Sequence, residues 1–207
     1  MYRHTFRHLN YGKRNGIFME KDATNANNIK LYLQQLDLDR QPTNEDLKSA
    51  VIGAIKDRTT IYYFIWKTIQ RLHPEIDADE IMRDASADAG NYSGKKSGEI
   101  DSAQQALKAF SSKTGCLAFE QDFTQLEDGY AEKVFGRCPH MEALKELGCT
   151  KDEMAHLCQD MLSYSDYGYF APHTAVHMEF KEQISNNDPI CRMCISRIPK
   201  PTATDSH

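Results

Sequence analysis

The chain has 207 residues, of which 40% are hydrophobic and 27% are charged, and its formal net charge is −5. This length and composition are those of a globular domain with a sizeable core. The negative charge excludes recruitment of nucleic acid by the field of the whole molecule, and the most apolar stretch, residues 61–66, is far shorter than the roughly 20 residues that span a bilayer.

The first residues have no apolar run behind their charges, so the sequence shows no export signal and predicts a cytoplasmic protein without a membrane partner. In that compartment the six cysteines are expected as thiols, serving as core residues, metal ligands or reactive groups. The segment from Cys116 onward is acidic, so an anionic substrate bound there needs a local Arg or Lys.

Helix signals dominate the first half of the chain. Residues 1–28 lack a clear period and are interpreted as an N-terminal arm, followed by a short helix over 28–36. A capping box at Thr43 opens a long helix that ends near His73-Pro74. Asp77 caps a further helix, which we expect to end at Gly90 before a flexible loop over 90–98. Another helix is predicted over 102–111.

The second half predicts two hairpins around two helices. Alternation over 117–123 and again over 130–135, with Asp128-Gly129 between them, predicts the first hairpin. Helices follow over 139–147 and, after a capping box at Thr150, to residue 162. Strands over 173–183 and 190–198 form the second hairpin. The expected class is α+β, with N-terminal helices followed by a ββ-αα-ββ unit whose sheet is antiparallel, in a single domain over 29–198 with a tail over 199–207.

Cys138 and His140 flank the proline that begins the helix over 139–147. The N-terminus of a helix lowers the pKa of a thiol, and His140 could deprotonate that thiol or share a metal with it. The alternative interpretation is a small buried residue at a strand–helix junction, and the motif alone does not decide between them.

Cys191 and Cys194 form a C-x-x-C pattern, which is typical of zinc or redox sites when it lies on a knuckle. Here the pattern falls in a predicted strand, where side chains alternate with period two. The two sulfurs should therefore face opposite sides of the sheet, which argues against a shared metal and against a disulfide.

Four further residues are candidates. His177 and Glu179 share one face of the strand over 173–183, spaced as an acid–base pair or as metal ligands. Because apolar side chains occupy the other face of this strand, alternation favours the alternative, in which the two are surface residues. Cys158 lies on the apolar stripe of its helix, where a cysteine is usually a small hydrophobic residue. The aromatic run around Tyr167 is a candidate pocket wall.

The order and spacing of these motifs resemble the L-2-amino-thiazoline-4-carboxylic acid hydrolase family over roughly residues 45–198. The shared pattern is a Cys-Pro that opens a short helix ending in Leu-Gly, a second cysteine at 158, and Asp188-Pro-Ile-Cys191 before the last strand. The chain departs from the pattern at Arg192 and Met193, where the family has Asp-Phe, and Cys194 is additional.

The resemblance implies a hydrolase that opens a C–N or C–S bond of a small cyclic amidine or thiazoline bearing a carboxylate. It also implies that the sulfurs of Cys138, Cys158 and Cys191 converge on one cavity beside the sheet. Arg137 or Arg192 would anchor the carboxylate. The attacking group is then a cysteine thiolate or a hydroxide on a divalent metal such as zinc. The alternative is a non-catalytic small-molecule or metal-binding sensory domain, and a homodimer is expected only by analogy of fold.

Overall fold

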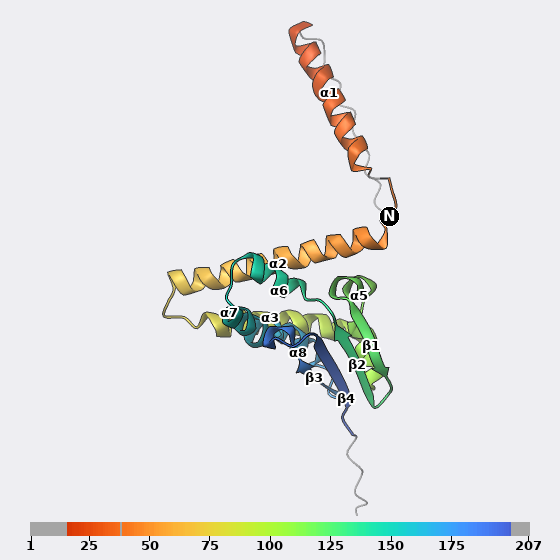
Figure 1. Ribbon diagram of the computed structural model, residues 1–207, viewed down its shortest axis with the longest axis vertical. Helices are drawn as coiled ribbons and strands as arrows, with labels where there is room; N and C mark the ends of the chain where they lie inside the picture. The colour runs from red at the N-terminus through yellow and green to blue at the C-terminus, as the bar shows by residue number, and fades with distance from the viewer. Residues whose placement is uncertain (1–15, 38, 200–207) are drawn as a thin grey trace, which may run out of the picture. The chain divides into compact units, whose positions relative to one another are not determined.

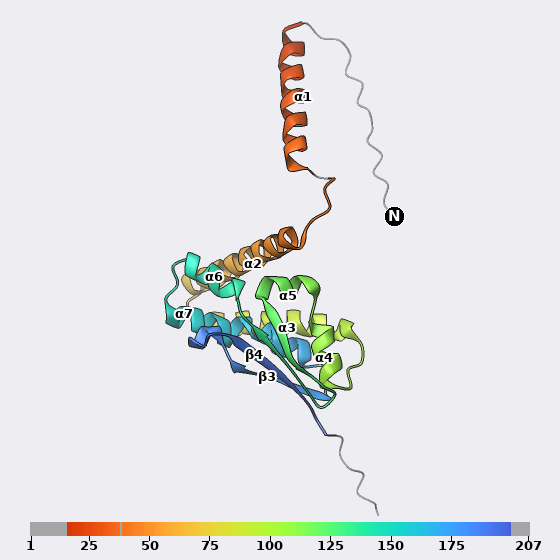
Figure 2. The same ribbon diagram turned by 45° about the vertical axis from the view of Figure 1, so that its right-hand side comes forward.

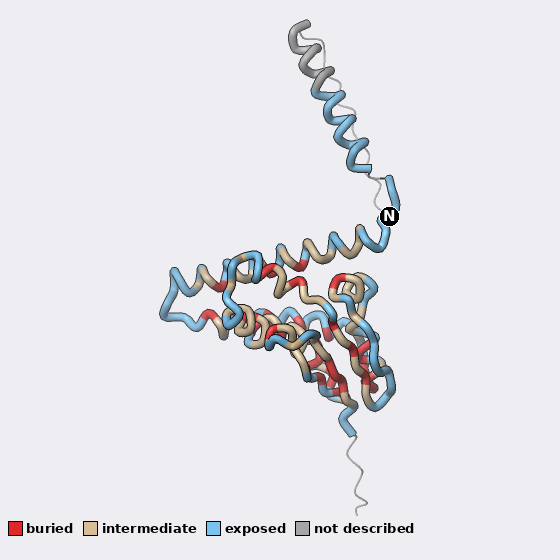
Figure 3. Tube along the Cα trace, viewed as in Figure 1, coloured by how far each residue is buried: buried red, intermediate tan, exposed pale blue. Residues whose placement is uncertain are grey.

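The computed structural model describes residues 16–37 and 39–199, which fall into two compact units, one ending at Pro42 and the other beginning at Thr43. The first unit contains helix α1 (Gly16–Leu36), which begins within the segment predicted as an arm. The side chains of residues 25–36 of this helix are all exposed, and this part of it is blue in Figure 3. The rest of the predicted arm, residues 1–15, and residues 200–207 of the predicted tail lie outside the described residues.

The second unit has the predicted α+β order, with helices first and then two hairpins separated by helices (Figure 1). Its elements are α2 (Asn44–Leu72), α3 (Ala78–Gly94), η1 (Lys95–Ser97), α4 (Ala103–Phe110), α5 (Lys113–Phe119), β1 (Gln121–Leu126), β2 (Tyr130–Phe135), α6 (Pro139–Glu146), α7 (Lys151–His156), the π-helical turn η2 (Leu157–Leu162), α8 (Tyr164–Phe170), β3 (Val176–Glu182), η3 (Ile184–Asn186) and β4 (Cys191–Arg197).

The four strands form one antiparallel sheet in the order β1-β2-β4-β3, so the second hairpin joins the first through β4. Along β2 the residues Ala131, Lys133 and Phe135 are buried, and those between them are less so. This alternation gives the sheet an inner face and an outer face. Helices α3, α4 and α8 lie on the inner side (Figure 2).

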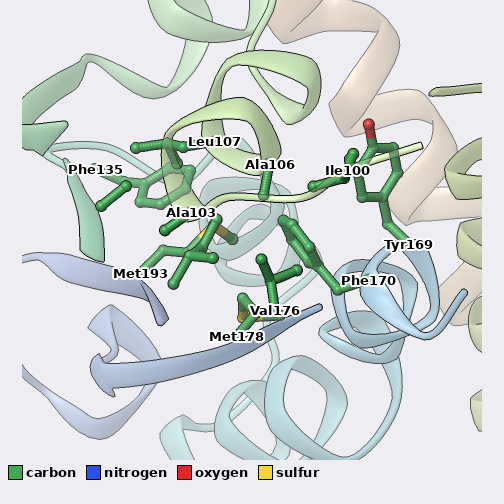
Figure 4. Packing of buried hydrophobic residues seen from close by; sticks show 12 residues of the cluster. Ile100, Ala103, Ala106, Leu107, Phe135, Tyr169, Phe170, Val176, Met178 and Met193 are labelled. Atoms are coloured by element: carbon green, nitrogen blue, oxygen red, sulfur yellow. The ribbon is translucent and has the colours of Figure 1, made fainter. Parts of the chain in front are cut away.

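Two apolar clusters hold the unit together. The larger one lies between the inner face of the sheet and helices α4 and α8, and Figure 4 shows its side chains packed against one another. The smaller one joins α2, α3, α6 and the helical segment after α7 around Trp66, Met82 and Leu157. Each cluster buries its apolar surface away from water, which is the main stabilising contribution to such a fold.

Local signals explain most of the element boundaries. The predicted capping boxes at Thr43 and Thr150 are both present, and Asp77 accepts hydrogen bonds from two backbone N–H groups at the start of α3. The strand predicted over 117–123 is wrong in its first half. Ser112 caps a short helix there, and the chain leaves it through Glu120, whose positive φ of 50° ends the helix directly before β1.

The predicted helix end at Gly90 is also wrong, because α3 continues to Gly94 and the expected loop over 90–98 is mostly helical. Gly90 instead allows α3 to approach α8. A Cβ atom at Gly90 would lie 2.0 Å from the carbonyl oxygen of Ser165, and one at Gly94 would lie 2.1 Å from that of Tyr169. On the opposite helix, a Cβ at Gly168 would lie 2.2 Å from the carbonyl oxygen of Ala87. The two backbones therefore touch, with no room for a side chain between them.

His156 links three helical segments through charged hydrogen bonds. Its Nε2 lies 2.8 Å from Oδ2 of Asp79 on α3, and its Nδ1 lies 2.7 Å from Oδ2 of Asp160 in η2. Trp66 of α2 donates to the other oxygen of Asp79. Both ring nitrogens face carboxylates, so the arrangement needs the doubly protonated imidazolium. Partial burial opposes that charge, but the two carboxylates outweigh it and raise the pKa of His156.

Among the described residues, no helix combines the length and the apolar character needed to cross a membrane.

Replacement of Gly168 by alanine should destabilise the protein by about 3 kcal/mol or more, because the added methyl group forces the α3 and α8 backbones apart. Chemical denaturation measures this loss. Gly53→Ala is the matched control: its Cβ meets nothing within 4 Å, and alanine in a helix should stabilise by up to about 1 kcal/mol. Equal midpoints for the two variants would contradict the close approach.

The contribution of His156 to stability should depend on pH. Because its folded-state pKa is raised, the stabilisation is complete below the unfolded pKa of about 6.5 and is lost as the pH rises through the folded value. The difference in unfolding free energy between the wild type and His156→Gln should therefore shrink from acid to alkaline pH. Thr68→Val, at an exposed position of α2 that carries no titratable group, serves as the control and should give a flat difference.

Candidate functional site

A cavity of about 380 Å³ lies between the inner face of the sheet and helices α2, α3 and α8. This volume suits a small molecule. The aromatic rings of Phe110, Phe119 and Phe135 form part of the apolar wall of the cavity. The polar side chains that border the cavity are those of Arg58, Ser93, Ser112, Gln121, Arg137, Cys138, His140, Cys158, Ser163, Ser165, Asp166, Tyr169, Gln183 and Cys191.

The three cysteines of the predicted site line this one cavity. Cys138 directly precedes α6, Cys158 lies in the π-helical turn η2, and Cys191 is the first residue of β4. Charge on Cys158 or on Cys191 would raise the pKa of Cys138, so the sulfurs lie within electrostatic range of one another. Side chains that are separated in the chain by up to fifty-three residues thus meet at one place.

Burial keeps these cysteines in the thiol form. It is the largest influence on Cys138 and raises the pKa well above the ordinary value, although the backbone N–H groups of His140 and Met141 at the start of α6 favour the thiolate. Burial likewise raises the pKa of Cys158 and brings that of Cys191 to about 11. The backbone N–H of Ile184, 3.3 Å from the sulfur of Cys191, favours the thiolate there.

His140 is neutral, and its hydrogen bonds fix the tautomer. The hydroxyl of Thr59 donates its one proton to the carbonyl oxygen of Ile55 at 2.8 Å, so it can only accept from Nδ1 of His140, 2.6 Å away. Nε2 is then the unprotonated nitrogen, and Nη2 of Arg58 faces it at 3.4 Å. Burial and the charge of Arg58 lower the pKa of His140 to about 3.

The cavity also contains positive charge. Arg137 borders it but is held in a two-pronged ion pair with Glu142. Arg58 of α2 has no ion-pair partner among residues 16–37 and 39–199, and His140 is the side chain to which it is hydrogen-bonded. Arg58 is therefore the guanidinium that is available to an anion, although the sequence suggested Arg137 or Arg192.

Two buried side chains of opposite charge type, Lys133 and Asp166, lie within electrostatic range of each other near the site. Lys133 is fully buried on the inner face of β2, and its Nζ donates to Ser111 and to Oε1 of Gln121, each at 3.1 Å. Burial lowers the pKa of Lys133 to about 8. Asp166 of α8 borders the cavity, and burial raises the pKa of its carboxyl to about 6, against the opposing effects of Lys133 and Arg58.

Other residues predicted from the sequence lie elsewhere. His177 and Glu179 are exposed on the outer face of β3, as expected for the alternative in which they are surface residues. Tyr167 is 39% exposed and does not border the cavity, although its ring packs against Phe180, which does. Arg192 and Cys194 are on the outer face of β4, where both contact Glu132. As the period-two argument predicts, Cys191 and Cys194 thus lie on opposite faces of the sheet.

Within the described part of the chain, no three His, Cys, Asp or Glu side chains are arranged to hold a metal ion. The six cysteines are unpaired.

Sequence reasoning missed Arg58, Lys133 and Asp166. For two of them a signal exists. Lys133 alternates with Ala131 and Phe135, so the predicted strand already places a lysine on the apolar face. Arg58 follows Ile55 by three residues, near the apolar stripe of its helix. Asp166 has no such signal, because its position depends on how α8 packs.

The tautomer of His140 can be tested by replacing Thr59 with valine, which removes the acceptor of Nδ1–H at unchanged size. We expect a loss of about 1–3 kcal/mol in stability, because a buried donor is left unpaired, together with a change in the ring ¹⁵N shifts of His140. In the wild type these shifts should stay those of the neutral Nδ1–H form from about pH 5 to 8. Thr68→Val, at an exposed position of α2, should change neither quantity.

Comparison with known proteins gives one match. The family model for L-2-amino-thiazoline-4-carboxylic acid hydrolase matches residues 55–195, which includes every cysteine of the cavity. No curated protein and no solved structure matches the chain significantly. Since the matched segment is well over half of the sequence, the chain belongs to the L-2-amino-thiazoline-4-carboxylic acid hydrolase family.

Proposed function

We propose that this protein is a hydrolase that opens a small cyclic amidine or thiazoline ring bearing a carboxylate, with a cavity cysteine as the nucleophile. The observation that carries the proposal is the meeting of Cys138, Cys158 and Cys191 in one cavity of small-molecule size, in a chain of this family. Cys138 is the preferred nucleophile because two backbone N–H groups at the start of α6 stabilise its thiolate.

The chemistry begins with addition of the thiol across the C=N bond of the ring. A bond forms between Sγ and the ring carbon, and the thiol proton passes to the ring nitrogen. The tetrahedral carbon then expels the ring sulfur, or the ring nitrogen of an amidine, and leaves the carbon attached to the cysteine. Attack of water on this carbon releases the carbamoyl product and returns the thiol, so that one water is consumed in each cycle.

Substrate binding follows from the charges of the cavity. The carboxylate binds Arg58, whose guanidinium has no ion-pair partner in the described part of the chain. The amide oxygen of Gln121 accepts from Lys133 and from Cys116, which leaves the NH2 group of this amide to donate toward the ligand. The aromatic walls enclose the ring.

Incubation of the purified protein with 2-amino-thiazoline-4-carboxylate should release a free thiol that can be titrated, and related rings without the carboxylate should react poorly. Cys138→Ser should lower kcat by at least about 1,000-fold. Cys194→Ser is the matched control, since this sulfur lies on the other face of the sheet and its loss should leave kcat near the wild-type value. Arg58→Gln should mainly raise KM.

Full activity of the Cys138, Cys158 and Cys191 variants, each changed separately to serine, would overturn the cysteine mechanism. Binding of such rings without turnover would instead favour a sensory domain. Activity that disappears with a chelator and returns with zinc would favour a metal-bound hydroxide.

A further inference from the structure

Among the described residues that line the cavity, Asp166 is the only one with a carboxylate. Glu142 does not border the cavity, and its carboxylate is paired with Arg137. Any step that moves a proton through a carboxyl group inside the cavity must therefore use Asp166.

The position of Asp166 is fixed by the backbone. Gly90 and Gly168 bring α8 against α3, and in this arrangement Ser165, Asp166 and Tyr169 border the cavity, whereas Tyr167 does not. No Lys, Arg or His in residues 16–37 or 39–199 forms an ion pair with Asp166. Its carboxyl thus faces the cavity without a bound counter-ion, within electrostatic range of Cys158, Cys191 and Lys133.

The other titratable groups of the cavity are unsuited to proton transfer. The Nδ1 proton of His140 is committed to Thr59, its Nε2 faces Arg58, and its pKa of about 3 makes it a poor base. The hydroxyl of Tyr169 is hydrogen-bonded to Ser97. Asp166, with a pKa raised to about 6, has the proton affinity that favours transfer in both directions near neutral pH.

We propose that Asp166 is the general acid and general base of the ring-opening reaction, an inference that rests on the proposed function. As an acid, it donates its proton to the ring sulfur as the C–S bond breaks, which leaves an isothiouronium cation on the cysteine beside the Asp166 carboxylate. As a base, it takes a proton from the water that attacks this cation.

The cycle closes without any further reagent. The new C–O bond gives a neutral tetrahedral carbon, and its bond to the cysteine sulfur breaks with the electron pair going to sulfur. The hydroxyl proton passes to that sulfur, so the carbamoyl product leaves and both the thiol and the acid form of Asp166 are restored. The carboxylate also stabilises the cationic intermediate by its charge.

The test compares Asp166→Asn with Asp84→Asn, an exposed position on α3, in the full-length protein. Asp166→Asn should lower kcat by about 100- to 10,000-fold with little change in KM. The pH profile of the wild type should show a step near pH 6 that the Asp166→Asn variant lacks. Added formate should partly restore the activity of Asp166→Ala, which a merely structural role would not allow.

The two proposals fail differently. If the wild type turns over the ring but Asp166→Asn is equally fast and keeps the same pH profile, the role of Asp166 is wrong and the proposed function stands. If the wild type opens no ring of this class, both proposals are overturned together. A variant that no longer unfolds cooperatively is replaced by Asp166→Glu, whose longer side chain keeps the carboxyl and should keep the step in the pH profile.

Discussion

The contact between the backbones of α3 and α8 determines where the site lies. Gly90, Gly94 and Gly168 remove the side chains that would otherwise separate the two helices. Because α8 also packs against the sheet, the same contact sets the distance between the sheet and α3 and so the width of the cavity. Stability and function therefore depend on the same three residues, which provide no chemical group themselves.

The electrostatics of the site follow from burial. A lysine, an aspartate and three thiols share a region with little water, and in each case burial shifts the pKa toward the neutral form. Lys133 and Asp166 each partly offset the effect of burial on the pKa of the other, and they form no direct ion pair. Such an arrangement leaves the carboxyl able to change its protonation at little cost, whereas a tight ion pair would hold it ionised.

The sequence predicts the structural features that depend on residues close together in the chain, such as helix caps and turns. Capping residues at Thr43, Asp77 and Thr150, and the turn at Asp128-Gly129, identify elements that the structure contains, and the order of the cysteines identifies the family. Prediction failed where the same residue type occurs in two kinds of structure. A glycine such as Gly90 is typical of a helix end, but here it allows two helices to pack closely. Arg58 and Asp166 are brought to one cavity only by the tertiary structure, which local patterns do not reveal.

The π-helical turn η2 has a consequence for the direction of side chains along its helix. In an uninterrupted α-helix, eight residues rotate the side chain by about 80° beyond two full turns. A π-helical turn takes up one additional residue, so the rotation from Cys158 to Asp166 is only about 20° short of two full turns. The π-helical turn thereby places the sulfur of Cys158 and the carboxyl of Asp166 on the same face of the helical segment. Insertion or deletion of a single residue within 157–162 is the simplest change that would place them on different faces.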